Sequence, residues 1–193
     1  MSTIGPDAGQ ASSESAVAGH VSVGHEDLLS SLAKLAIEST DLVSFQQQLL
    51  ELLGRRLDVS RCYIFTYRAE DDTVDNTAEW TGPDVTPQQQ ELQGIPSEAA
   101  PWWTARMRRG EDIRFDDIED ITDEGTREVL APQGILSVLA VPLHIGTRYY
   151  GFMGFDECRK HRHWTDQERA LLSGAVRILM GVWADDDLRQ SEG

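Results

Sequence analysis

Three side chains of the kinds that bind metal ions lie close together near the C-terminal end, in the C-x-x-H-x-H pattern of Cys158, His161 and His163. Thiolate and imidazole groups are zinc ligands, but a closed tetrahedral site needs a fourth ligand, and none is evident nearby. The intervening side chains are basic, and their positive charge would oppose a bound cation. We therefore interpret residues 158–163 as a solvated basic loop and expect no metal site.

The other candidates for chemistry also have plain structural interpretations. Residues 111–128 contain nine carboxylates, but without the spacing of a calcium loop, so a solvated acidic face is favoured. His144 follows a buried apolar run and suits a core histidine. No Ser/His/Asp or Cys/His arrangement and no phosphate-binding glycine loop is legible. We expect no enzymatic activity; redox chemistry at Cys62 or Cys158 remains as an alternative.

Asp156 stands where an apolar, glycine-rich segment gives way to a polar loop. Its carboxylate could accept hydrogen bonds from a ligand. It could instead form a structural ion pair with Arg159 or Arg162, as charged side chains at strand ends often do.

The segment before Asp156 predicts a central hairpin. Residues 136–143 are almost continuously apolar, which favours a strand that is buried on both faces. Gly146 and Thr147 can form a tight turn, because glycine readily adopts positive φ. Residues 149–156 then form the second strand, in which Gly151 and Gly154 allow a close approach to the backbone.

The remaining elements follow from periodicity. Apolar stripes and capping residues predict helices over 26–37, 42–57, 101–109, 124–130 and 165–188, with a further short helix over 86–92. The last helix should open on a capping box formed by Thr165 and Glu168. Strands are predicted over 61–68, with both faces buried, over 73–80, as an exposed partner, and over 112–115, as a short edge.

Composition limits the class of protein. The 193 residues carry a net charge of −16, which disfavours nucleic acid and anionic membranes as partners. Two cysteines form no disulfide framework, and no signal peptide or membrane-spanning segment is apparent, so we expect a cytoplasmic protein. Residues 1–24 are rich in Gly, Ser and Ala and predict a disordered leader. We expect one domain over 25–189 and a tail over 190–193.

Several segments together resemble the GAF domains of bacterial sensor histidine kinases and diguanylate cyclases. They are LLELLGRRLDVSRCYIF, EW, PWW, QGILSVLAVPL, GFMGFDECR and WTDQERALL, which lie between residues 49 and 172, and the resemblance covers about residues 26–187. The signatures of three better-known branches are missing, namely those that bind cyclic nucleotides, that carry a bilin on a cysteine, and that reduce methionine sulfoxide.

The resemblance implies an α+β, PAS-like fold with an antiparallel sheet of five or six strands. Terminal helices would cover one face, and short helices and loops would enclose a ligand pocket on the other. It also implies a regulatory role in bacterial signal transduction, a kinase or cyclase as output domain, and a homodimer formed through helices 26–57 and 165–188. The cofactor, if any, stays unknown.

In the ligand pocket that the resemblance implies, we expect an unidentified small molecule to be bound by Trp80, Trp102, Trp103, Phe115, Tyr150 and Asp156. The alternative is that the tryptophans simply fill the core. The first functional hypothesis is accordingly a non-catalytic ligand sensor that signals through its terminal helices. The second is a ligand-free structural dimerisation module.

Overall fold

The computed structural model describes residues 12–191, with side-chain positions for residues 24–186. Its centre is a six-stranded sheet in the order β3-β2-β1-β6-β5-β4, in which every neighbouring pair is antiparallel. The strands are β1 (Arg61–Arg68), β2 (Thr73–Thr81), β3 (Ile95–Pro96), β4 (Ile113–Phe115), β5 (Ser137–Ile145) and β6 (Arg148–Glu157). This confirms the predicted α+β fold with an antiparallel sheet.

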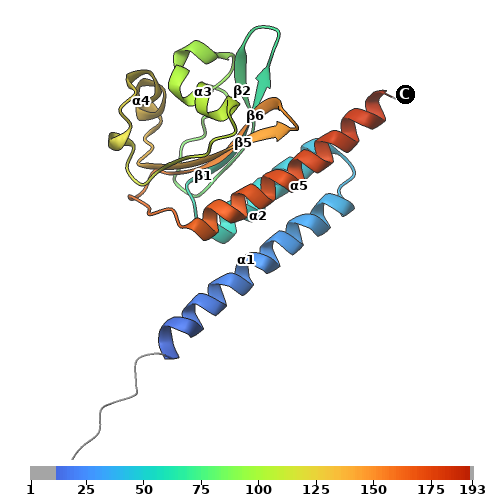
Figure 1. Cartoon of the computed structure of the whole chain (residues 1–193), viewed down its shortest axis with the longest axis vertical. Coiled ribbons are helices and arrows are strands. Elements are labelled where there is room, and N and C mark those ends of the chain that lie inside the picture. Colours follow the sequence, from blue (N-terminus) through green and yellow to red (C-terminus); the bar gives the residue numbers. More distant parts are fainter. Residues whose placement is uncertain (1–11, 192–193) are drawn as a thin grey trace, which may run out of the picture.

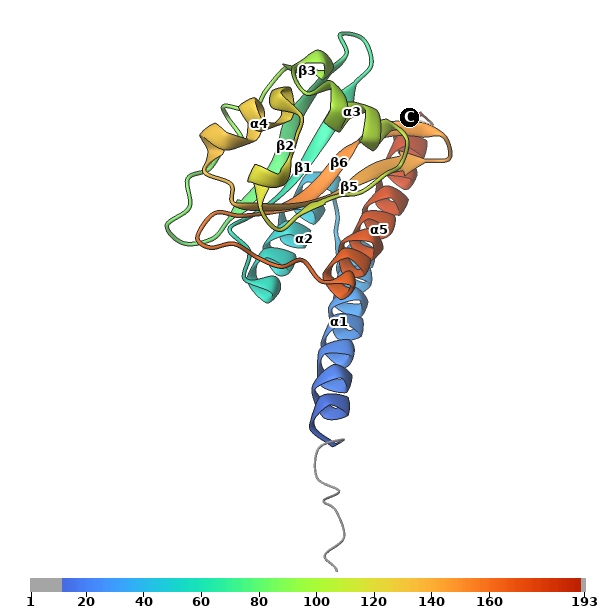
Figure 2. The same cartoon turned by 60° about the vertical axis from the view of Figure 1, so that its left-hand side comes forward.

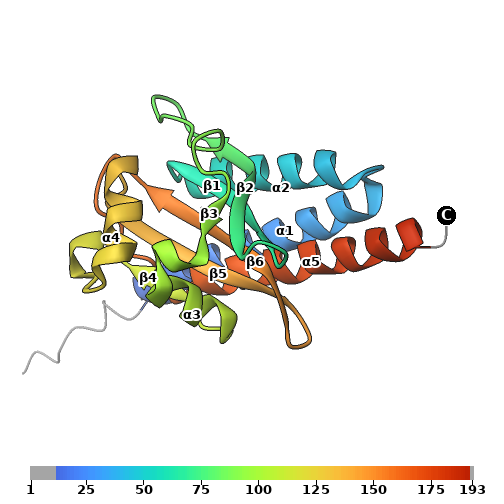
Figure 3. The same cartoon turned by 90° about the horizontal axis from the view of Figure 1, so that it is seen from above.

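Two helical layers cover the sheet, one on each face (Figure 1; Figure 3). One face packs against α2 (Leu42–Leu57) and α5 (Asp166–Ser191), with α1 (Ser12–Glu38) packed on these two helices, and the other face packs against α3 (Pro101–Arg108) and α4 (Glu124–Leu130). Three short 3-10 helices lie in the second layer, at Ser97–Ala99, Ile118–Asp120 and Ala131–Gln133. The molecule therefore has two apolar cores, which we call the helix-side core and the cavity-side core.

The hairpin β5–β6 forms as predicted. Residues 146 and 147 connect the two strands, and Gly146 has φ +59°, the left-handed conformation that glycine adopts without strain. β5 is buried along most of its length because α5 packs on one of its faces and the cavity-side core on the other. β6 and β1 occupy the middle of the sheet.

Local capping sets the helix ends. Asp41 accepts a hydrogen bond from the backbone N–H of Ser44 (2.8 Å) and so begins α2. The predicted capping box begins α5: the N–H of Thr165 donates to Glu168 (2.8 Å), and the N–H of Glu168 donates to the Thr165 hydroxyl (3.1 Å).

The helix predicted over 86–92 and the exposure predicted for the strand over 73–80 are both wrong. Residues 86–92 form a loop with a single turn, because this loop bonds to β2: the side chain of Gln93 donates to the Asn76 carbonyl (2.8 Å) and that of Gln89 to the Thr77 carbonyl (3.1 Å). β2 is consequently half-buried rather than exposed.

Residues 12–24 were predicted to belong to a disordered leader, but they extend α1, whose N-terminal half projects away from the sheet (Figure 2). A helix that is already nucleated over residues 25–38 lengthens at little further cost. Residues 1–11 of the predicted leader lie outside the described residues, and the domain limits of 25 and 189 stay predictions. Within the described part of the chain, no helix combines the length and apolarity needed to span a bilayer.

Candidate functional site

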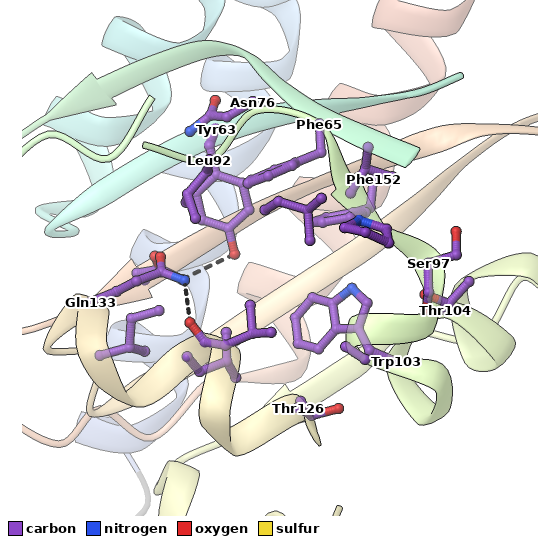
Figure 4. Close-up of a pocket in the computed structure, with 18 of the residues that line it drawn as sticks. Tyr63, Phe65, Asn76, Leu92, Ser97, Trp103, Thr104, Thr126, Gln133 and Phe152 are labelled. Carbon is purple, nitrogen blue, oxygen red and sulfur yellow. Dashed lines mark hydrogen bonds between the residues drawn. The ribbon is translucent and has the colours of Figure 1, made fainter. Parts of the chain in front are cut away.

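The cavity-side core contains a pocket between the sheet and the layer of α3 and α4. Strands β1, β2 and β6 form its floor, and residues 92–104 and 126–135 form its walls and roof (Figure 4). Its volume is about 60 Å³. Pockets for drug-sized ligands have roughly 300–1,000 Å³. In this conformation the space therefore suits a molecule of a few heavy atoms.

Aromatic rings make most of the floor. Phe65 and Phe152 stack with ring centroids 4.6 Å apart and an interplanar angle of 11°. Tyr63 meets Phe65 edge-on at 5.5 Å, and Trp103 of α3 meets Phe152 edge-on at 5.5 Å. Such contacts contribute stabilisation beyond the area that they bury, so these rings have defined positions around the open space.

A buried ion pair lies at one end of the pocket. Arg61 Nε donates to Asp156 Oδ2 (3.1 Å), and the Tyr63 hydroxyl donates to Asp156 Oδ1 (3.0 Å). Arg61 and Asp156 are 1% and 2% exposed, so each charge is stabilised by the other rather than by water. Burial raises the pKa of Asp156 to about 6, although Arg61 and Tyr63 act to lower it.

A second polar group ties the loop after β2 to the floor. Glu79 Oε1 accepts the backbone N–H groups of Gln88 (2.8 Å) and Gln89 (3.3 Å), and Glu79 Oε2 accepts Nδ2 of Asn76 (2.9 Å). Glu79 and Asn76 both line the pocket. The wall formed by this loop is thus held by a buried carboxylate rather than by apolar packing alone.

The six residues predicted to bind a ligand fall into three groups. Trp103 and Asp156 line the pocket. Trp102 and Phe115 pack against each other in the cavity-side core, with centroids 6.0 Å apart, but do not line the pocket. Trp80 and Tyr150 lie on the opposite face of the sheet, in the helix-side core, which corrects the expectation that they face the pocket.

A β-bulge explains why the side chain of Trp80 faces away from the pocket. Along β1–β2, Ile64 pairs with Ala78 but Phe65 pairs with Asn76, so Thr77 is an extra residue. Side chains alternate between the two faces of a strand, and an inserted residue reverses that alternation. Asn76 therefore faces the pocket, whereas Trp80, four positions later, faces α2.

A second β-bulge explains why the side chain of Tyr150 also faces away from the pocket. Along β5–β6, Leu143 pairs with Gly151 but His144 pairs with Tyr149, which leaves Tyr150 as the extra residue. Gly151 has φ +134°, and a Cβ there would lie 1.9 Å from a backbone oxygen of β1, so glycine is required at this bulge. Tyr149 reaches the pocket, and Tyr150 packs near Trp183 of α5 with centroids 6.3 Å apart.

Sequence reasoning missed several pocket residues. The alternation of Tyr63 and Phe65 in β1 was a usable signal, because both lie on one face of a strand that was predicted to be buried on both faces. Asn76 and Glu79 were missed because their strand was interpreted as exposed. No sequence pattern shows that the 82–94 loop covers them.

The predicted ion pairs of Asp156 with Arg159 or Arg162 are not formed. Both arginines turn to the next carboxylate, Glu157, whose Oε1 accepts Arg159 Nε at 3.0 Å and whose Oε2 lies 3.7 Å from Arg162. Burial acts to raise the pKa of Glu157, but hydrogen bonds from Arg159 and Ser60 lower it overall. Strand alternation is the reason: Asp156 points to the pocket and Glu157 away from it.

Arg162 extends this network to two helices. It donates to the Leu57 carbonyl at the end of α2 (2.8 Å) and to Glu168 Oε1 in the first turn of α5 (2.6 Å). The loop after β6 is largely exposed, as predicted for a solvated basic loop, but Arg162 also ties it to both helices. His161 and His163 pair with Asp117 and Asp116 respectively.

Within the described residues, no three His, Cys, Asp or Glu side chains are grouped as metal ligands. Burial raises the pKa of Cys62 well above its usual range and also raises that of Cys158. Both side chains are therefore held as thiols, which are poor nucleophiles.

Comparison with known proteins agrees with this architecture. Residues 41–181 match the GAF domain family model. The chain is similar to the methanogenesis regulatory histidine kinase FilI of Methanothrix harundinacea, with 33% identity over 144 residues. The match covers 69% of this chain but only 16% of the kinase, so the chain corresponds to a small part of that protein.

Two solved structures illustrate the fold. The phycocyanobilin-bound GAF domain from a cyanobacterial phytochrome is 17% identical, with a TM-score of 0.73 over 86% of this chain and 96% of that one. The free methionine-R-sulfoxide reductase from Neisseria meningitidis, in complex with its substrate, is 15% identical, with a TM-score of 0.67 over 86% and 91%. At such identities the likeness concerns the fold alone. Because the family model matches more than half of its residues, the chain belongs to the GAF domain family.

Proposed function

We propose that this GAF domain is a non-catalytic sensor of a small molecule in a signal-transduction protein, and that it passes the state of its pocket to α1, α2 and α5. The observation that carries this proposal is the position of β6, which belongs to both cores. Phe152 and Asp156 face the pocket, while Met153 and Phe155 face the helices. A ligand that shifts β6 must therefore change the packing of both layers.

The route from the pocket to α5 is short. Phe155 stacks on Trp164, the residue before the capping box, with centroids 6.1 Å apart and an interplanar angle of 28°. Glu157 is linked through Arg162 to Glu168 in the first turn of α5. A ligand transmits a signal only if it binds two arrangements of the domain with different affinities. The contacts of Phe155 with Trp164 and of Arg162 with Glu157 and Glu168 are those that would differ between the two arrangements.

We also propose that the terminal helices form a homodimer. Ile37 and Val43, at the junction of α1 and α2, are 85% and 75% exposed. A two-fold dimer would place both sets of helices together, so that a change in α5 could reach an output domain such as a kinase or cyclase.

A second candidate function is a ligand-free structural dimerisation module. The small pocket volume of about 60 Å³ favours it, because the aromatic side chains themselves occupy most of the space. The sensor hypothesis is preferred because a residue that lines the pocket, Asn76, buries an acceptor, Oδ1, that has no hydrogen-bond partner among the described residues.

A thermal-shift screen with small metabolites and fragments of a few heavy atoms separates the two candidates. A sensor shows a saturable rise in melting temperature with one compound, as binding to the native state requires. Ala100→Leu, just before α3, would add a side chain at the pocket wall and abolish this rise, whereas Ala105→Leu, on the exposed side of α3, would keep it. Stabilisation that survives Ala100→Leu would contradict binding in the pocket.

Signalling is tested by hydrogen–deuterium exchange with the compound found in the screen. We expect changed protection in the first turn of α5 and the last turn of α2, the two ends that Arg162 connects. Changes confined to α3 and α4 would contradict the transmission step but not the binding.

A further inference from the structure

The walls of the pocket are predominantly apolar. Their aliphatic and aromatic side chains come from the sheet and from the layer that covers it, and they include Phe65, Leu92, Ile95, Trp103, Leu130 and Phe152 (Figure 4). A ligand in this space is therefore surrounded mainly by carbon atoms, and apolar contact must supply most of its binding free energy.

The hydroxyl groups of the lining residues mostly bond within the protein. Four of them have protein partners, namely those of Tyr63, Ser97, Thr104 and Thr126. For example, the hydroxyl of Thr104 donates to the Ser97 carbonyl (3.1 Å), and that of Thr126 donates to Asp123 Oδ2 (2.7 Å). The exception among the described residues that line the pocket is the half-exposed Tyr149. A polar group on a ligand would thus lose its hydrogen bonds to water and find few replacements.

The two side-chain amides that line the pocket also bond within its wall. Asn76 Nδ2 donates to Glu79 Oε2 (2.9 Å), and Gln133 Nε2 donates to the Val129 carbonyl (2.7 Å). Oδ1 of Asn76 has no partner among the described residues, but the protein encloses this atom completely. It is therefore out of reach of a ligand in this conformation.

Ions of either sign find no free partner in the pocket. The charged side chains that line it are the carboxylates of Glu79 and Asp156, and no described Lys or Arg lines it, so an anion would be buried beside like charges. The oxygens of Glu79 already accept three hydrogen bonds, and those of Asp156 are bound by Arg61 and Tyr63. A cation would have to give up its water for oxygens that are already occupied, at a large cost in free energy.

The size of the occupant follows from the volume of about 60 Å³. A water molecule needs roughly 10–15 Å³ on the same measure, so the space holds roughly four to six heavy atoms. Cavities with apolar walls take up apolar guests rather than water.

We propose that the pocket selects an uncharged, apolar molecule of about four to six heavy atoms, such as a short branched hydrocarbon, and discriminates against polar and charged molecules of the same size. This inference rests on the proposed sensor function and names the chemical class that the sensor recognises.

The test uses four compounds of one size and a spectroscopic signal inside the pocket. Isobutane, isopropanol, the isopropylammonium ion and acetate each have one central carbon bonded to three further heavy atoms, and they differ in polarity and charge. Protein labelled with 15N-tryptophan reports five indole N–H groups. Trp103 lines the pocket, whereas Trp80 lies across the sheet and serves as internal control. Trp103→Phe assigns the signal, and isobutane is titrated by equilibrating the protein with the gas at several partial pressures.

We expect isobutane to move the Trp103 signal saturably. Its affinity should be higher than that of isopropanol by about tenfold, because a hydroxyl that is buried without a partner costs at least the corresponding free energy. At the same concentrations, isopropylammonium and acetate should leave the Trp103 signal unchanged.

A substitution that adds a hydroxyl to the wall tests the cause of this order. Val74 of β2 lines the pocket, and Val74→Thr replaces one methyl group by a hydroxyl at nearly the same volume. It should reduce the preference for isobutane over isopropanol severalfold, since isopropanol then finds a hydrogen-bond partner. Val43→Thr, the same change at a 75% exposed position of α2, should keep the preference of the unaltered protein. If Val74→Thr does not fold, the four compounds decide the proposal on the unaltered protein.

The outcomes separate the two levels of the proposal. Equal or tighter binding of isopropanol, tighter binding of either ion, or an unchanged preference in folded Val74→Thr would overturn the proposed class while the pocket remains a binding site. If neither these four compounds nor any compound of the thermal-shift screen moves the Trp103 signal, the sensor function and the class are both overturned.

Discussion

The packing of Trp80 on α2 predicts that a normally stabilising substitution will destabilise this protein. Gly54 lies in the last turn of α2, and a Cβ built there would be 2.0 Å from Cε3 and 2.3 Å from Cζ3 of Trp80. Carbon atoms in contact lie about 3.5–4.0 Å apart, so in Gly54→Ala the indole ring must retreat by roughly 1.5 Å.

The magnitude follows from two opposing effects. Alanine in place of glycine within a helix stabilises by about 1 kcal/mol. Overpacking of a core costs about 1–3 kcal/mol, and a contact this short belongs at the upper end of that range. We therefore expect Gly54→Ala to lower the free energy of unfolding by about 1–2 kcal/mol.

The assay is urea denaturation followed by far-UV circular dichroism, repeated at several protein concentrations to control for dimerisation. Gly181→Ala in α5 is the matched control, because a Cβ there meets nothing within 4 Å; it should stabilise by about 1 kcal/mol. In a Trp80→Leu background the clash disappears, so Gly54→Ala should become stabilising there, with a coupling energy of about 2–3 kcal/mol. If Gly54→Ala stabilises the unaltered protein as much as Gly181→Ala does, Trp80 does not pack on α2.

Three further predictions concern the pocket, a helix end and the thiols. Burial raises the pKa of Asp156 to about 6 from 3.8, so its contribution to stability is complete below pH 4 and is lost as the pH rises through 6. The stability of Asp156→Asn relative to wild type, measured by urea titrations, should therefore rise by about 3 kcal/mol between pH 4 and 7. A difference that does not depend on pH would contradict the shift. Thr165→Ala removes the capping box of α5 and should cost about 1 kcal/mol, measured by the same titration, with Thr165→Ser near wild type. Because burial raises the pKa values of Cys62 and Cys158, thiol labelling of the native protein at pH 8 should be slower than that of a free cysteine; faster labelling would revive a redox function.

The sequence by itself determined most of the elements and their order. A hairpin around Gly146 and a helix begun by Thr165 and Glu168 depend on residues close together in the chain, so local rules suffice to predict them. The alternation of Tyr63 and Phe65 likewise marked one face of a buried strand. The antiparallel sheet between two helical layers follows from these signals and from the family resemblance.

Only the tertiary structure decided which side chains form the pocket. Single-residue bulges at Thr77 and Tyr150 reverse the side-chain alternation, so Trp80 faces the helices although the strand pattern gives no sign of it. The partner of Asp156 is Arg61, 95 positions away, and such a pair exists only when β1 and β6 lie side by side. Contacts of this kind depend on the register between strands, and a single sequence does not specify that register to one residue.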